Sequence, residues 1–413
     1  MDDRINSILF SIMIIAFLKP FNVQGQLDFQ AMNLALKYNQ DNNIPMQYQI
    51  SKKDNTFIVL FSLELPDQVN FNEQYSLLYE IKDEYSSKNS KMIRTLNFPR
   101  SGIGEERGIK YFSIEIEEAD DMNILFLRLK NNLSAIEYVW DIPLKGPLTY
   151  DSPDFFLVQH ETQLPHLKSY LNFGKRLRIQ PADSVPGTYY IYHYDQTFSA
   201  ADPPMYRLDK DISRSMQVDT IFSVESGESF TLPNYGLYFI QSDTTSYSGI
   251  SIRSEEKFFP KLVTMEDIID PVIYLTTSQE IDRLKKNDNQ KEAFEKFWLN
   301  LSKSEDQASR LIREYFEQVE LANSLFSNYK EGWKTDMGMI YIIFGPPAEV
   351  SNNGETESWY YGQQGPNTPA IVFNFLHLKS VFTQQHYLLI RDKQYKNSWF
   401  KAIDDWRRGR INR

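Results

Sequence analysis

The sequence predicts a multidomain, mainly β protein in which immunoglobulin- or fibronectin-like sandwiches are followed by a C-terminal α+β module. Short runs rich in β-branched and aromatic residues recur up to about residue 260, and helical periodicity replaces them after that point. The chain has 413 residues, which is longer than one hydrophobic core usually serves. Its 25 Tyr and 28 Phe can supply β-rich cores.

The first element, residues 1–25, has the layout of a secretory signal peptide. A polar start is followed by the apolar run Ile8–Leu18 and by small residues near Gly25. That run is well short of the roughly 20 residues of a membrane-spanning helix, and a buried N-terminal helix is the alternative. We therefore expect an exported chain, periplasmic or associated with the outer membrane, without a transmembrane segment after cleavage.

Residues 26–148 are expected to form the N-terminal β-sandwich. Strand-like runs alternate there with polar or Gly/Pro segments and show no helical periodicity. These runs are residues 56–61, 75–79, 111–116 and 124–127. The segment Pro143–Pro153, which contains Gly146-Pro147, marks the boundary of this domain.

Residues 149–262 are expected to form a second domain that resembles a β-sandwich. Its candidate strands are residues 177–179, 189–194, 220–224 and 236–240. Their spacing fits a small sandwich. The sequence leaves open whether the two β regions form one double sandwich or two separate ones.

Residues 263–413 are expected to form the α+β module, which begins with helices. One helix is predicted from about Gln290 to Trp298, with Phe294, Phe297 and Trp298 on one face. Ser304 can cap a longer helix that runs to about Phe326.

The most distinctive segment follows these helices. It contains Gly332-Trp333-Lys334-Thr335-Asp336, an apolar run Met339–Phe344 that reads as a strand, Gly345-Pro346-Pro347, and Trp359-Tyr360. This segment closely resembles the GWxTD domain family, named for the motif that stands here as Gly332, Trp333, Thr335 and Asp336. The resemblance covers about residues 264–413 and implies an exported protein of Bacteroidota-type bacteria, in a family whose members generally lack an assigned activity.

A weaker likeness concerns the pattern of an apolar strand ending in Gly-Pro-Pro, a polar hairpin, Trp-Tyr and a further strand. This pattern is similar to the small lipoprotein module of the outer-membrane β-barrel assembly machinery. The likeness implies a scaffold without catalysis.

The present chain has no cysteine, so a lipid anchor on cysteine, disulfides and thiolate metal sites are excluded.

The candidate interaction residues all belong to the distinctive segment: Gly332, Trp333, Thr335, Asp336, Gly345, Pro346, Pro347, Trp359 and Tyr360. Trp333 and Trp359 can be core anchors, which we favour, or an exposed platform for a sugar or peptide. Thr335 and Asp336 are expected to bond backbone N–H groups and fix a turn.

Catalysis by Asp336 would require a second ionisable group, and Glu349, Glu355 and Glu357 are the candidates on the following hairpin. Gly345-Pro346-Pro347 lacks the residues of a phosphate loop and is interpreted as a strand terminator before a hairpin at residues 352–354.

No predicted site takes a metal or a cofactor. None of the five histidines has a recognised metal spacing, although His377 and His386 can face each other across a hairpin. Near the C-terminus, Trp399, Ile403 and Trp406 share a helical face that can cover a sheet edge. The alternative is a basic tail, Arg407, Arg408, Arg410 and Arg413, that binds an acidic partner or anionic lipid.

The net charge of −11 argues against nucleic acid as a partner. No serine-nucleophile elbow or dinucleotide fingerprint is present. The sequence therefore favours a non-catalytic envelope scaffold, or accessory subunit, that binds an outer-membrane assembly or secretion complex.

Two alternatives remain. One is a periplasmic hydrolase with paired carboxylates, acting on glycan or peptide between the second β region and the C-terminal module. The other is a carbohydrate-binding protein that exposes an aromatic row, with Tyr189, Tyr190, Tyr192 and Tyr194 as the test.

Overall fold

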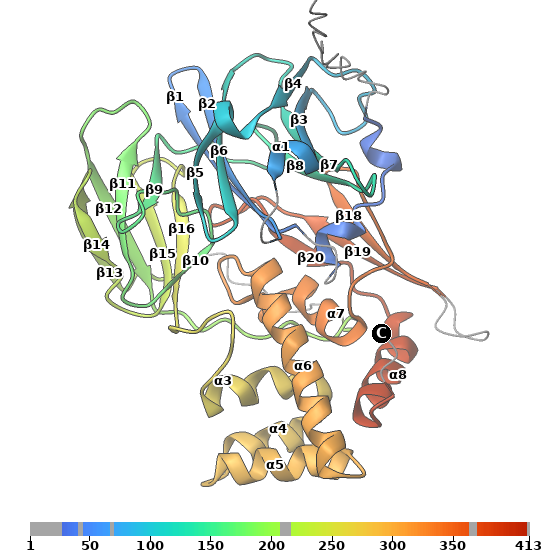
Figure 1. The fold of residues 1–413 in the computed structure, drawn as a ribbon. Coiled ribbons are helices and arrows are strands. Elements are labelled where there is room, and N and C mark those ends of the chain that lie inside the picture. The colour runs from blue at the N-terminus through green and yellow to red at the C-terminus, as the bar shows by residue number, and fades with distance from the viewer. Residues whose placement is uncertain (1–26, 40–43, 67–69, 207–215, 363–369, 411–413) are drawn as a thin grey trace, which may run out of the picture.

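The computed structural model describes residues 27–39, 44–66, 70–206, 216–362 and 370–410. Two β-sandwiches lie against a C-terminal module of helices and a further sheet (Figure 1). The predicted mainly β class with a C-terminal α+β part is confirmed. The predicted signal peptide lies outside the described residues. Within them, no helix has the length and apolar character needed to cross a membrane.

The N-terminal sandwich consists of two antiparallel sheets, which contain all four predicted strand runs. The first has the order β1 (Met46–Lys53), β2 (Thr56–Glu64), β6 (Ile109–Glu117) and β5 (Gly102–Glu106). The second has the order β4 (Met92–Leu96), β3 (Tyr75–Lys82), β7 (Ile124–Asn131) and β8 (Glu137–Pro143). Helices α1 (Phe71–Gln74) and α2 (Phe98–Ser101) connect strands. Apolar side chains of alternate positions fill the space between the sheets, where Phe61 stacks on Phe112.

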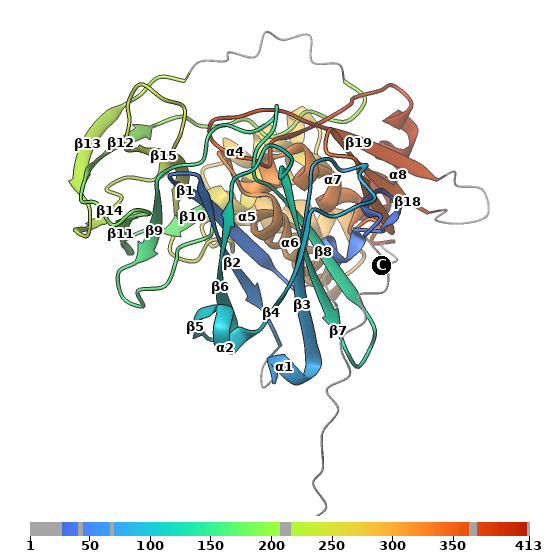
Figure 2. The same cartoon turned by 90° about the horizontal axis from the view of Figure 1, so that it is seen from above.

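The second sandwich has its own core, so the two β regions form two separate sandwiches, which lie side by side in Figure 2. Its larger sheet has the order β10 (Tyr170–Asn172), β16 (Ile250–Glu255), β15 (Gly236–Gln241), β12 (Thr188–Tyr194) and β13 (Thr220–Glu225). Its smaller sheet has the order β14 (Ser229–Thr231), β11 (Arg176–Pro181) and β9 (Phe155–Gln159). Strands β10 and β16 are parallel to each other.

The C-terminal module begins with helices and continues into an antiparallel sheet. The helices are α3 (Met265–Ile269), η3 (Asp270–Leu275), α4 (Ser278–Lys285), α5 (Gln290–Leu301), α6 (Glu305–Phe326), η4 (Gly332–Lys334) and α7 (Asp336–Phe344). The sheet has the order β17 (Glu349–Asn352), β18 (Thr356–Tyr361), β19 (Ile371–His377) and β20 (Tyr387–Leu389), and α8 (Tyr395–Arg407) follows it. Helix α6 has the predicted start and end, because the Ser304 hydroxyl accepts a hydrogen bond from the Gln307 N–H at 3.2 Å.

The run Met339–Phe344 is helical, which corrects the prediction of a strand. It forms most of α7, and residues 339–343 are buried on every side of the helix. A helix that is apolar all round carries no periodicity, so a short run of this kind cannot be distinguished from a buried strand by its pattern.

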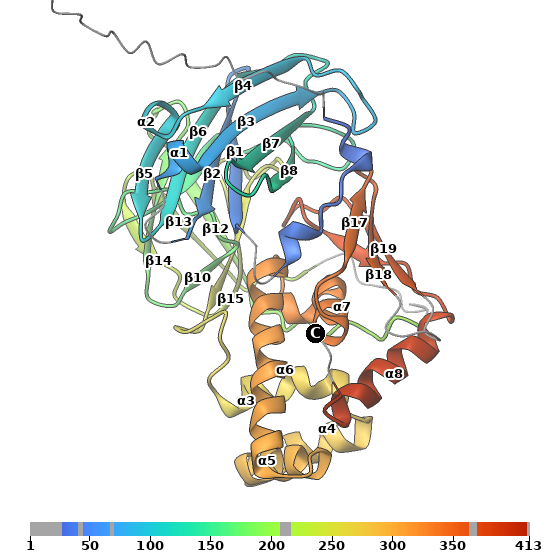
Figure 3. The ribbon, with the colours of Figure 1, turned by 45° about the vertical axis from the view of Figure 1, so that its right-hand side comes forward.

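Residues 27–38, which we call the N-terminal strap, lie between the N-terminal sandwich and the C-terminal module (Figure 3). The strap contains η1 (Phe29–Ala31) and η2 (Ala35–Tyr38). Phe29 packs on Phe126 of β7, with ring centroids 4.6 Å apart. Leu34 donates its N–H to the carbonyl of Val350 in β17 at 2.8 Å. The strap therefore joins the first and last domains of the chain.

Candidate functional site

The GWxTD motif lies at a joint between α6, η3 and α7. Gly332 packs so closely that an added Cβ would lie 2.0 Å from the backbone oxygen of Ala322. Trp333 is 5% exposed, and its backbone N–H donates to the side-chain oxygen of Asn323 at 3.0 Å. The carbonyl of Trp333 accepts a hydrogen bond from the Tyr274 hydroxyl at 2.8 Å. Trp333 is thus a core anchor and not an exposed platform.

Thr335 is the N-cap of α7. Its hydroxyl oxygen accepts a hydrogen bond from the Gly338 N–H at 2.9 Å, and the hydroxyl donates to the Gly332 carbonyl at 2.7 Å. An added Cβ at Gly338 would lie 1.9 Å from the Gly332 oxygen. Gly338 therefore extends the structural motif by two residues, and the sequence analysis did not select it.

Asp336 forms a buried ion pair with Arg391, a residue that the sequence analysis also missed. Both side chains are 5% exposed. The two carboxylate oxygens accept from the guanidinium at 2.5 and 3.0 Å, and one also accepts the Leu389 N–H at 2.7 Å. Arg391 in turn donates to the backbone carbonyl of Asp202 at 3.0 Å. The carboxylate therefore ties the start of α7 to β20, and its partner is a cation.

Gly345 ends helix α7, so the prediction that Gly345-Pro346-Pro347 terminates a strand is wrong. Gly345 has φ of +78°, a conformation that favours glycine, and its N–H bonds the Tyr341 carbonyl at 2.8 Å. Pro346 is half-buried and Pro347 is buried. The Gly345 carbonyl accepts from the Tyr361 hydroxyl at 2.8 Å, which fastens this turn to β18.

On β18, Trp359 and Tyr360 point to opposite faces of the sheet. Trp359 is fully buried, whereas Tyr360 is exposed. The indole N–H of Trp359 donates to the Glu357 carboxylate at 2.7 Å, and that carboxylate also accepts from the Tyr38 hydroxyl of the strap at 2.6 Å. The predicted hairpin at residues 352–354 is present between β17 and β18. The Glu357 carboxylate connects β18 to the strap through its hydrogen bond with Tyr38.

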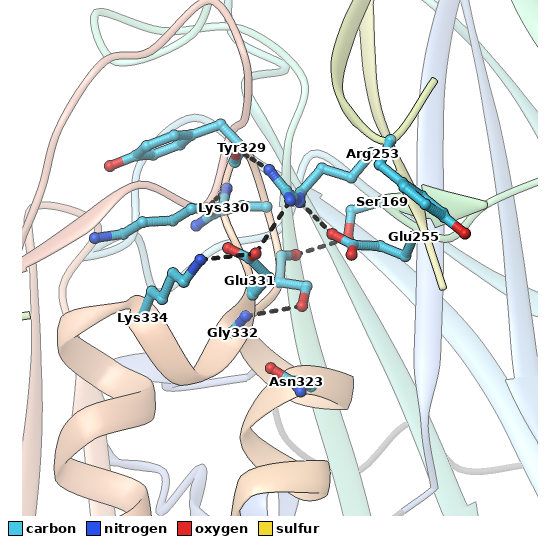
Figure 4. Close-up of polar contacts among 12 residues, drawn as sticks. Ser169, Arg253, Glu255, Asn323, Tyr329, Lys330, Glu331, Gly332 and Lys334 are labelled. Carbon is cyan, nitrogen blue, oxygen red and sulfur yellow. Dashed lines mark hydrogen bonds and ion pairs between the residues drawn. The ribbon is translucent and has the colours of Figure 1, made fainter. Parts of the chain in front are cut away.

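A group of charged residues connects the second sandwich to the motif, and we call Arg253, Glu255, Glu331 and Lys334 the junction cluster (Figure 4). Arg253 of β16 contacts Glu255 at 2.5 Å and Glu331 at 3.3 Å, and Lys334 contacts Glu331 at 2.8 Å. Burial raises the pKa of Glu255 to about 7, against the opposing effect of Arg253. Charges that would be costly alone are therefore paired across the domain boundary.

Hydroxyl groups extend this connection to the motif itself. The Ser169 hydroxyl donates to the Ser327 carbonyl at 2.7 Å, and the Ser327 hydroxyl accepts the Gly332 N–H at 2.9 Å (Figure 4). Arg253 also donates to the Tyr329 carbonyl at 3.0 Å. The second sandwich therefore holds the segment before the motif at two carbonyl groups, and a hydroxyl of the segment holds Gly332.

A second buried ion pair lies beneath the strap. Lys37 contacts Asp141 of β8 at 2.9 Å, and the Tyr85 hydroxyl donates to the same carboxylate at 2.9 Å. Burial alone would raise the pKa of Asp141, but the charge and hydrogen bond of Lys37 lower it below its usual value. Burial and the nearby Glu357 carboxylate raise the pKa of Tyr38 well above its usual value. These carboxylates hold the strap in place.

His377 and His386, the two histidines of the predicted hairpin, are enclosed by the protein's own residues. The ring of His377 lies 3.2 Å from the Gly354 carbonyl and 2.7 Å from the Gln384 carbonyl, while burial lowers the pKa of His386 to about 4. Across the described ranges, no three His, Asp or Glu side chains gather in a way that could hold a metal ion.

The C-terminal arginines are engaged with the protein's own acids. Arg407 donates to Glu280 at 2.8 Å, and Arg408 and Arg410 each lie 2.8 Å from Asp404. Arg413 lies outside the described residues. Trp399 and Trp406 of α8 are buried as predicted, and Ile403 is half-buried beside them.

The tyrosines of β12 do not form the open aromatic row that a sugar-binding face would need. Tyr189 and Tyr194 are buried, Tyr192 is half-buried and Tyr190 is exposed.

Residues 236–408 match the family model of the GWxTD domain. The matched range begins at the first residue of β15, so it includes β15 and β16 of the second sandwich together with the C-terminal module. It therefore contains the whole junction cluster as well as the motif. A comparison with curated proteins gives no match. By the match to the family model, residues 236–408 of the chain form a GWxTD domain, and the named motif lies within it.

Proposed function

We propose that this protein is a non-catalytic scaffold or accessory subunit of a bacterial cell envelope, exported by its N-terminal segment, that binds a partner complex at or near the outer membrane. One observation carries the proposal: the polar groups of the motif are used inside the fold. The Thr335 hydroxyl caps a helix, and the Asp336 carboxylate is taken up by Arg391 and the Leu389 N–H. A motif of this kind supports architecture rather than chemistry.

Two further carboxylates beneath the strap have similar roles. Asp141 is bonded to Lys37 and Tyr85, and Glu357 to Tyr38 and Trp359. A general acid or base must reach a substrate proton, whereas these groups are covered by the strap. The geometry therefore favours the scaffold over the hydrolase.

The second sandwich exposes more large apolar side chains than the N-terminal sandwich, and two of them are in contact, which favours it as the partner-binding domain. Among the described residues, those in the N-terminal sandwich are Ile103 and Leu133. The region 149–262 has a larger set: Phe173, Val185, Tyr190, Tyr206, Ile221, Tyr235, Tyr247 and Phe258. The C-terminal module has a set of similar size: Val263, Ile273, Leu299, Tyr360, Leu376, Ile390 and Phe400. Exposed apolar side chains that lie next to each other are typical of protein-binding sites.

Within this set, Phe173 and Tyr235 form an exposed aromatic pair. Their ring centroids are 4.7 Å apart, and the side chains are 44% and 48% exposed. Exposed aromatic side chains with a fixed orientation commonly dominate the binding energy of protein interfaces. The pair is therefore the first place to change in a test of partner binding.

The test is affinity purification of the tagged protein from gently solubilised envelopes, with mass spectrometry of co-eluting proteins. The test variant combines Phe173→Ser with Tyr235→Ser. The control is Leu133→Ser, which removes a side chain that is 79% exposed on the other sandwich. We expect outer-membrane components in fixed stoichiometry with the wild type and the control, and their loss with the test variant. Recovery of all three proteins without any envelope protein would contradict the proposal.

A further inference from the structure

Strand β13 is a sheet edge, and no other strand of the described residues pairs with its outer side. It ends the order β10-β16-β15-β12-β13, and it lies on the side of the second sandwich that faces away from the C-terminal module (Figures 1 and 2). Its pairing with β12 continues without a bulge from Thr220 to Glu225. An edge strand presents a row of backbone N–H and C=O groups that can pair with another chain.

Features that protect other edges of this protein are missing from β13. The edge of β1 is covered by the chain around β9, where Lys52 donates its N–H to the Pro153 carbonyl at 2.7 Å. The edge of β17 is covered by the strap. Strand β5 has a bulge between Gly102 and Gly104 and ends in two glutamates. By contrast, β13 has neither proline nor lysine, and Glu225 at its end is its one charged residue.

The side chains of β13 are also incompletely buried. Phe222 and Val224 face the core of the second sandwich but remain half-buried, because the sheet ends there. Ile221 on the outer face is 56% exposed. A further strand beside β13 would complete the burial of these three apolar side chains.

We propose that β13 pairs antiparallel with β13 of a second copy of this chain, around a twofold axis at Ser223, so that the two five-stranded sheets become continuous. Side chains opposite each other in an antiparallel pair point to the same face. With the axis at Ser223, Phe222 of one copy lies opposite the partner's Val224, and each sandwich core is extended by an apolar neighbour.

Charge selects this register over the one centred on Phe222. A symmetric pairing around Phe222 would place Glu225 opposite the partner's Asp219, and like charges directly opposite are destabilising. With the axis at Ser223, Glu225 lies opposite the partner's Ile221, and Asp219 opposite the partner's Gly227. No like charges meet in this arrangement.

The dimer would leave the aromatic pair of the proposed function accessible. Phe173 follows β10, which is the opposite end of the same sheet order. Each dimer would therefore carry two copies of the pair at its far ends, so one scaffold could engage two partner molecules. The dimer itself does not depend on the proposed function, since it rests on β13 alone.

The first measurement is the molar mass of the purified full chain by light scattering over a range of protein concentrations. The variant is Ser223→Lys, which places two ammonium groups beside each other at the axis, and the matched control is Thr231→Lys, at an exposed position of β14 in the other sheet. We expect a dimer for the wild type and the control. The variant should be a monomer whose circular dichroism matches that of the wild type.

Single cysteines then test the register, because the chain has no cysteine of its own. In the variant Ser223→Cys the two thiols would lie on Cα atoms about 4.5–5.5 Å apart, within disulfide range, and an added oxidant removes one hydrogen from each thiol. In Ile221→Cys the equivalent atoms would be two pairs away from the axis on either side and too distant to join. We expect a covalent dimer from Ser223→Cys but not from Ile221→Cys.

A monomer at every concentration, or a dimer that Ser223→Lys leaves intact and Ser223→Cys does not link, would overturn the proposal. Pairing of β13 with a strand of an envelope protein, in place of a second copy, would overturn it as well.

Discussion

Replacing Asp336 with asparagine removes the charge of a buried carboxylate while leaving the size of the side chain nearly unchanged. The Asn oxygen can still accept the Leu389 N–H, but the amide N–H₂ cannot accept a hydrogen bond from Arg391. The guanidinium would then lie in the protein interior, with 5% of its side chain exposed and no carboxylate beside it.

The expected loss follows from this geometry. Removing one partner of a buried ion pair costs about 3–5 kcal/mol, because the other charge stays buried and uncompensated. Loss of the negative charge at the start of α7 adds about 0.3–1 kcal/mol. Since domains are typically stable by about 5–15 kcal/mol, this single change should strongly lower the free energy of unfolding.

The assay is urea unfolding followed by tryptophan fluorescence, with Asp404→Asn as the matched control. Asp404 is 43% exposed and contacts Arg408 and Arg410, so its loss should cost less than about 1 kcal/mol. Adding Arg391→Met to Asp336→Asn removes both charges, and the double variant should be more stable than Asp336→Asn alone. A loss from Asp336→Asn no larger than that from Asp404→Asn would refute this reasoning.

Three further outcomes are expected. Gly332→Ala should destabilise the protein by about 1–3 kcal/mol or more, because its Cβ would meet the Ala322 backbone. Gly362→Ala, whose Cβ would meet no atom of the described residues within 4 Å, should have little effect in the same urea titration. Tyr38→Phe should cost about 1–3 kcal/mol by leaving Glu357 without its 2.6 Å hydrogen bond, and faster limited proteolysis near the strap would report its release. Two histidines should destabilise the fold on acidification, opposite in sign to Glu255, because burial lowers the pKa values of His166 and His386 to about 4, whereas an unfolded histidine has a pKa of about 6.5. At these sites the unfolded state binds more protons between the two values, so their contribution to stability is lost as pH falls from about 6.5 toward 4, by at most about 3 kcal/mol per histidine. His386→Gln should therefore lose less stability than the wild type between about pH 6.5 and pH 4, measured as the shift of the urea midpoint.

Features determined by local sequence could be predicted, as α6 and the strands illustrate. Ser304 bonds the Gln307 N–H and starts α6 where the capping pattern places it. The alternation of β12 and the aromatic runs of the N-terminal sandwich likewise became strands. In each case, the residues that determine the element lie within it or next to it.

The sequence around α7 contains local signals of a helix, but its apolar run favours a strand equally well. Thr335 at the N-cap, Asp336 in the first turn and Gly345 after the last turn are the usual signs of a helix. The same residues are also typical of a turn and of a strand terminator. The short apolar run between them does not decide between helix and strand, because a run of buried apolar residues favours neither period.

The connections between domains could not be predicted, because their partners are far apart in the chain. Asp336 and Arg391 are separated by 55 residues, and Tyr38 and Glu357 by 319. Arg253 and Glu331 meet only after the second sandwich has docked on the C-terminal module. A single sequence has no local pattern that pairs such residues.

The central claim is that the GWxTD motif holds the fold together and performs no chemistry of its own. The most direct measurement compares recovery of envelope partners by the wild type, by Asp336→Asn and by the double variant Asp336→Asn with Arg391→Met, each alongside its free energy of unfolding. The account predicts that partner recovery follows stability, so the double variant should regain both relative to Asp336→Asn. A double variant that is as stable as the wild type but recovers no partner would contradict the claim, because Asp336 would then act through its chemistry.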